Sequence, residues 1–129
     1  MSRRAWSLAL AGYLLVWIPF NFAAELMSTL PSLRMRGVAA IAELVAHGGV
    51  ALLCATAGRM ISAQPVAASR LAPLAIVASG VVSVQSLFWT VLPRNVAPGT
   101  RLPLVALTFA TVAFWLFVVS RLGATGGGR

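Results

Sequence analysis

The sequence has no lysine, no aspartate, and only one histidine and one cysteine among its 129 residues. Two glutamates are its only acidic residues, whereas ten arginines give it a formal net charge of +8. A single cysteine excludes an intramolecular disulfide, so cysteine content says nothing about the cellular compartment. A single histidine excludes a haem held by two histidines of one chain. Phosphate-binding loops, dinucleotide fingerprints and zinc-protease motifs are also missing from the sequence.

Apolar sequence is what the chain has in abundance. Hydrophobic residues make up 60% of it and charged residues 9%, a balance that water-soluble domains do not show. Four uncharged or nearly uncharged stretches, 5–24, 37–58, 71–93 and 102–120, leave every arginine outside them. Each is about as long as the roughly 20 residues that a helix needs to cross a bilayer. Helices of soluble proteins keep a polar face, so this pattern predicts an integral membrane protein.

The predicted fold is all-α: an integral membrane four-helix bundle of up-down-up-down antiparallel transmembrane helices with short connections. We expect one domain over residues 1–129, with spans at about 5–27, 37–61, 71–92 and 102–122 and a flexible glycine-rich tail over 123–129. Pro31 is expected to stop the first helix, and Pro98-Gly99 indicates a turn before the fourth. Ser69 is predicted to cap the third helix, with Pro73 in its first turn.

The arginines predict the orientation of the chain and its surroundings. Six of them fall on the side that holds both termini and the middle connection, and four fall on the other side. Because cytoplasmic loops are the richer in arginine, this favours both termini in the cytoplasm, in a bacterial-type inner membrane. The arginines stand in ones and twos, so we expect the lipid bilayer as partner and no nucleic acid. A membrane-protein partner or a homo-oligomer remains open.

Glu43 and His47 are the most unusual pair in the sequence. They are four residues apart, so they lie on one face of a helix and can touch. Counted from Gly37, Glu43 lies about 9 Å and His47 about 15 Å into the predicted span. An ionisable residue at membrane depth is costly and faces the bundle interior with a partner. Small residues widen the same face into a surface that a neighbouring backbone can approach closely, namely Gly48, Ala51, Cys54, Ala55 and Gly58.

Polar residues of the other spans are expected at a matching level. Asn21 and Glu25, four residues apart, follow Tyr13 and Trp17 on one side of the first span. With antiparallel neighbours, these residues and the polar groups of spans three and four fall in the membrane half away from the termini. We therefore predict one ligand- or proton-binding site without metal, cofactor or catalytic residues, composed of Glu43, His47, Asn21, Gln85, Glu25 and Ser86.

Other interpretations of these residues stay open. The polar groups could form a structural network that fixes the helix register, and Glu25 could pair with Arg34 or Arg36. A metal site built from Glu25, Glu43 and His47 is disfavoured because it is poor in histidine. Nucleophilic catalysis is disfavoured because Cys54 lies about 10 Å along the helix from His47.

Our leading functional hypothesis is non-catalytic binding or transport of a small solute or proton, with Glu43 as the titrating group and His47 as its partner. The first alternative is an accessory or assembly subunit of a larger membrane complex, docked through its apolar surface. The second is a membrane-embedded enzyme that acts on a lipid-soluble substrate. Four-span architecture alone does not choose among the three, because fold does not imply function.

Overall fold

The computed structural model describes residues 2–63, 65–88 and 97–124, which are 97% helical and contain no strand. The chain begins with α1 (Arg3–Gly12), the π-helix η1 (Tyr13–Trp17) and α2 (Ile18–Thr29), which continue into one another. The short helices η2 (Leu30–Ser32) and α3 (Leu33–Arg36) lead to α4 (Val38–Ala63) and α5 (Pro65–Phe88). The 3-10 turn η3 (Pro98–Thr100) precedes α6 (Arg101–Ala124). The predicted all-α, four-helix architecture is confirmed.

Four helical segments are long and apolar enough to cross a membrane by length and composition: Arg3–Arg36, Val38–Ala63, Arg70–Phe88 and Arg101–Gly123. The end of the predicted third span, 89–92, lies outside the described residues. The same holds for 125–129 of the predicted tail, while α6 continues through Gly123 and Ala124. Predicted and observed helices therefore coincide except near their ends.

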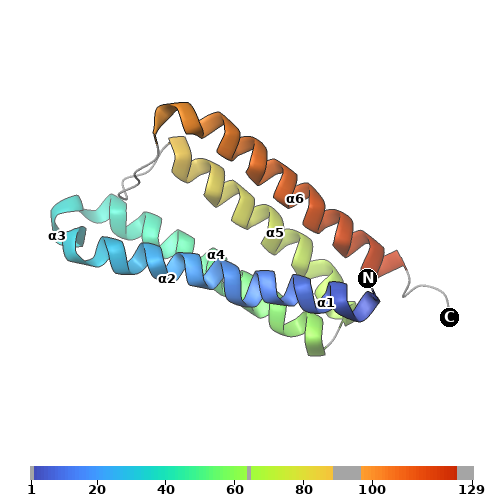
Figure 1. The fold of residues 1–129 in the computed structure, drawn as a ribbon. Coiled ribbons are helices and arrows are strands. Elements are labelled where there is room, and N and C mark those ends of the chain that lie inside the picture. The colour runs from blue at the N-terminus through green and yellow to red at the C-terminus, as the bar shows by residue number, and fades with distance from the viewer. Residues whose placement is uncertain (1, 64, 89–96, 125–129) are drawn as a thin grey trace.

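Successive helices run in opposite directions, and the start of α1 and the end of α6 lie at one end of the bundle (Figure 1). We call this the terminal end, and the opposite one the α3 end. Helix α4 packs against α1, η1 and α2 on one side and against α5 on the other. Helix α6 packs along α5 and reaches α1 near the terminal end. Toward the α3 end, the α5–α6 pair leans away from α2 (Figure 1).

Helix α4 is the central helix, since it packs against both the first long helix and α5. Its buried residues recur about every three or four positions. The buried positions are Ala40, Leu44, His47, Ala51, Cys54, Ala57, Gly58 and Ile61. With the adjacent Ala57 and Gly58 counted as one position, this spacing averages 3.5 residues per turn, the period of helices that wind around one another. A Cβ on Gly58 would lie 2.9 Å from the backbone nitrogen of Leu15 and 3.1 Å from the carbonyl oxygen of Ala11. The predicted small-residue face of α4 therefore does admit a neighbouring backbone.

The π-helix η1 keeps one face of the first long helix turned toward α4. Leu10, Leu14, Ile18 and Phe22 all pack into the core, at intervals of four residues. In an uninterrupted α-helix this interval would rotate the face by roughly 40° per turn. The wide turn corrects the rotation: the Ile18 N–H donates to the carbonyl of Tyr13, five residues earlier. Pro19, which follows directly, has no N–H to restore the regular pattern.

The predicted start of the third helix was wrong. Helix α5 begins at Pro65, so Ser69 lies inside the helix and is not its N-cap, and Pro73 lies deeper in the helix interior. Proline is favoured at a first helical position because that residue has no intrahelical acceptor for an N–H. The first proline after α4 therefore starts the helix, and the polar Ser69 is carried within it.

Candidate functional site

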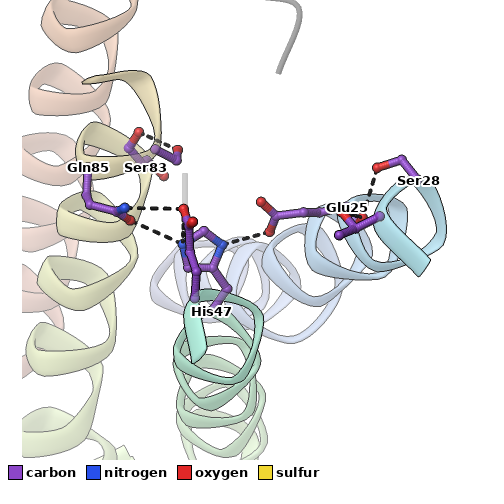
Figure 2. Close-up of polar contacts among 8 residues, drawn as sticks. Glu25, Ser28, His47, Ser83 and Gln85 are labelled. Carbon is purple, nitrogen blue, oxygen red and sulfur yellow. Dashed lines mark hydrogen bonds and ion pairs between the residues drawn. The ribbon is translucent and has the colours of Figure 1, made fainter. Parts of the chain in front are cut away.

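His47 lies at the centre of a polar cluster that joins three helices. Its Nδ1 is 2.9 Å from Oε2 of Glu25 on α2, and its Nε2 is 3.3 Å from Oε1 of Gln85 on α5. The same Nε2 lies 3.9 Å from Oε1 of Glu43, one turn earlier on α4. Figure 2 shows the imidazole between Glu25 on one side and Gln85 on the other. The predicted contact between Glu43 and His47 is confirmed.

The hydrogen bonds of Gln85 determine which atoms face the imidazole. Its Nε2 donates to Oε1 of Glu43 at 3.2 Å, which leaves the amide oxygen toward His47. Turning the amide over would bring its oxygen against the Glu43 carboxylate, so the observed orientation is the favourable one. Both ring nitrogens of His47 then face oxygen acceptors. With Glu25 ionised, the doubly protonated imidazolium, which donates from both nitrogens, satisfies the two contacts at once. A protonated Glu25 carboxyl would instead donate to Nδ1 of a neutral ring.

The cluster is shielded although it has three ionisable members. Side-chain exposure is 4% for His47, 10% for Glu43 and 16% for Glu25. Burial this deep makes an unmet hydrogen bond expensive, because water cannot replace a missing partner. One imidazole therefore connects α2, α4 and α5 through shielded polar contacts.

A cavity of about 240 Å³ adjoins the cluster between the first long helix, α4 and α5. Its polar lining includes Glu25, His47 and Asn21, and Tyr13, Trp17 and Phe22 supply aromatic surface. A second cavity of about 140 Å³, lined also by α6 residues, shares Tyr13, Ser79 and Ser83 with the first. The polar cluster thus borders a space large enough for a small solute.

The structure brings together four of the six predicted site residues: Glu25, Glu43, His47 and Gln85. Asn21 lines the cavity, but its Nδ2 donates to the carbonyl of Trp17 on its own helix at 2.7 Å. Ser86 is buried, and its hydroxyl donates to the carbonyl of Ser83 at 2.9 Å. Glu25 contacts His47, as the predicted site requires. Glu25 therefore belongs to the centre of the site, whereas Asn21 belongs to its margin.

Three residues that line the cavity, Tyr13, Ser79 and Ser83, are not among the predicted site residues. Ser79 and Ser83 stand seven and three residues before Ser86, a helical spacing that could have placed them on the same face. The sequence places Tyr13 on the same side of the first span as Asn21 and Glu25 but gives it no role in the site. Its ring stacks on Trp115 of α6 with centroids 4.8 Å apart, and no sequence pattern relates these two positions.

Metal and thiol chemistry find little support in the part of the chain that the structure describes. Within residues 2–63, 65–88 and 97–124, no group of three or more histidine, cysteine or acidic residues is arranged to hold a metal ion. The Cys54 thiol is fully buried and donates to the carbonyl of Ala75 at 3.5 Å, a packing role.

Comparison of the chain with protein families, curated proteins and solved structures found no match.

Proposed function

We propose that the protein is a four-span integral membrane protein that binds, and thereby transports, a small solute or proton at the His47 cluster. The outer surface supports the membrane location. Large apolar side chains such as Leu52, Phe109 and Leu102 are 69%, 65% and 75% exposed, respectively. Water-soluble bundles do not expose apolar surface on this scale, whereas lipid solvates it. By the arginine distribution, both termini face the cytoplasm of a bacterial-type cell.

The observation that carries the functional proposal is the position of one imidazole between acceptors from two different helices, at the edge of a cavity. Glu25 reaches it from α2 and Gln85 from α5, while Glu43 shares its helix. Tyr13 lines the cavity from η1. Intramembrane ionisable residues that pair across a bundle are typical of ion and proton pathways.

The geometry gives a mechanism for coupling a proton to a solute. When His47 releases its Nδ1 proton into the cavity, that nitrogen presents a lone pair to Oε2 of an ionised Glu25, and the contact becomes repulsive. The oxygen is then available to an N–H or O–H donor of a solute in the cavity. Proton release and solute binding use the same acceptor, so each changes the affinity for the other by the same factor.

The test is proton flux into liposomes that contain the purified protein and a trapped pH-sensitive dye. We expect wild-type protein to collapse an imposed pH gradient faster than protein-free liposomes do. Glu43→Gln and His47→Gln should reduce the rate to the protein-free level, because each removes a titrating group of the cluster. Thr56→Val is the matched control: Thr56 is an exposed residue of the same helix whose hydroxyl donates only to the carbonyl of Leu52.

Two results would contradict the proposal. A wild-type rate equal to that of protein-free liposomes would exclude proton transport. Full pH-dependent activity in Glu43→Gln, together with a much lower melting temperature, would make the cluster a structural network. That second result would favour the accessory-subunit hypothesis, because the apolar surface would then remain as the functional feature.

A further inference from the structure

A cavity of about 580 Å³ lies at the terminal end of the bundle, away from the His47 cluster. Four helices contribute to it: α1, α4, α5 and α6. Most of its lining is apolar, and the residues are Arg3, Arg4, Ser7, Leu8, Leu10, Ile61, Ser62, Ala72, Val119, Leu122 and Gly123. This cavity has more than twice the volume of the cavity beside His47. Its two charged lining residues, Arg3 and Arg4, are both positive.

The two arginines of this cavity have no acidic side chain of the protein to neutralise them. The only acidic residues in the sequence are Glu25 and Glu43, and both belong to the His47 cluster. Arg3 is held in place, because its Nη2 donates to the carbonyl of Leu122 on α6 at 2.9 Å. A guanidinium has five N–H donors, so this bond leaves others for an anion. Both arginines are exposed, so an anionic molecule can reach them and supply the counter-charge.

The remaining lining indicates which kind of anion fits. Leu8 is 61% exposed and Leu122 is half-buried, so both present apolar walls beside the charged residues. Buried Leu10 lies in the lining with them. A free phosphate would pair with the arginines but would leave the apolar walls of the cavity without a partner. A molecule with an anionic head and a hydrocarbon chain would satisfy both parts, since apolar burial is favourable along the whole chain. The first apolar helix begins at Arg3, which places the arginines at headgroup level in a membrane.

We propose that this cavity binds one phospholipid with a net negative headgroup, whose phosphate pairs with Arg3 and Arg4 while an acyl chain lies against the apolar walls. A zwitterionic headgroup fits less well, because its ammonium group would add positive charge beside two arginines. The proposal needs the membrane location put forward above but is independent of the chemistry of His47. Bound lipid would tie the start of α1 to the end of α6, the two helices that Arg3 already connects.

Native mass spectrometry of the purified protein in detergent, with lipid added, tests this site. The probes are phosphatidylglycerol and phosphatidylcholine with identical acyl chains. We expect one phosphatidylglycerol to be retained per chain at concentrations where phosphatidylcholine is not. The double variant Arg3→Gln/Arg4→Gln should bind phosphatidylglycerol roughly 30-fold more weakly, the loss expected for two arginines at an anionic headgroup. Arg59→Gln, which removes an exposed arginine that does not line this cavity, should stay within about twofold of wild type.

Two variants test the cavity without changing charge. Ser7→Trp from α1 and Ser62→Trp from α4 add bulk to opposite walls, and at least one of them should prevent lipid retention. Soluble glycerol 3-phosphate, which carries the phosphate without acyl chains, should not compete. Glu43→Gln should retain lipid like wild type, so a failed flux experiment would not affect this one.

Several outcomes would overturn the proposal. Equal retention of the two lipids would remove the role of headgroup charge, and an equal loss in Arg59→Gln would indicate general surface electrostatics. Unchanged retention in both tryptophan variants would place the lipid elsewhere. Competition by glycerol 3-phosphate would identify a soluble phosphate ester as the ligand.

Discussion

Three glycines of α4 allow a quantitative test of how closely the first long helix approaches the central one. Replacement of Gly58 by alanine would place the new Cβ 2.9 Å from both the nitrogen and the Cβ of Leu15. The same replacement at Gly48 would meet the ring of Phe22 at 3.0 Å, and at Gly49 it would meet nothing within 4 Å. All three lie in one helix, so the change in intrinsic helix propensity is common to them.

The expected energies follow from these contacts. Alanine stabilises a helix interior by about 1 kcal/mol relative to glycine, which sets the gain at Gly49. At Gly58 the clash involves backbone and Cβ atoms, which cannot move without separating the helices, so a penalty of about 1–3 kcal/mol opposes that gain. The ring atom that Gly48 would meet is the far end of a side chain and can rotate. We therefore expect the order of stability Gly49→Ala, then Gly48→Ala, then Gly58→Ala.

Thermal unfolding of the three variants in one detergent measures this order. For a protein of this size, about 1 kcal/mol corresponds to a shift of a few degrees in Tm, so Gly58→Ala should melt roughly 3–12 °C below Gly49→Ala. Equal melting temperatures for the two variants would refute the close approach of Leu15 to α4. A lower melting temperature for Gly49→Ala than for Gly58→Ala would mean that the other face of α4 is the crowded one.

Two further predictions concern topology and the imidazole. Reporter fusions after Gly123 and within 96–100 should report opposite sides of the membrane, and the same side for both would exclude four spans. Because His47 is the only histidine, ¹⁵N-histidine labelling gives the spectrum of one ring, which should show both nitrogens protonated in part of the pH range where the protein is folded. A ring that stays in one neutral tautomer throughout that range would contradict an ion pair between His47 and Glu25.

The sequence was sufficient to predict the helices and much of the site, because the signals involved are local. Apolar runs predicted the four long helices, and the four-residue spacing of Glu43 and His47 predicted their contact. The small residues of α4 predicted the close approach at Gly58. Each of these inferences needs only the periodicity of one helix.

Contacts between helices could not be predicted in the same way. Glu25 rather than Asn21 reaches His47, and this choice depends on the rotation of the first long helix, which the wide turn η1 adjusts. Pro19 was the only sequence signal near that turn, and a proline alone does not distinguish a π-turn from a kink. The stacking of Tyr13 on Trp115 depends on how α6 packs, for which one sequence has no pattern.

The composition of the cluster itself argues for a role beyond holding helices together. A structural network inside a membrane needs hydrogen bonds but no ionisable groups, and Gln85 shows that an amide fits this position. Yet both acidic residues of the chain and its one histidine lie within the same cluster. Each carboxyl is more expensive to bury than an amide of nearly the same size, so amides would give the more stable network. The property that carboxyls and imidazole have and amides lack is the ability to gain and lose a proton, which is why we connect this cluster with proton binding.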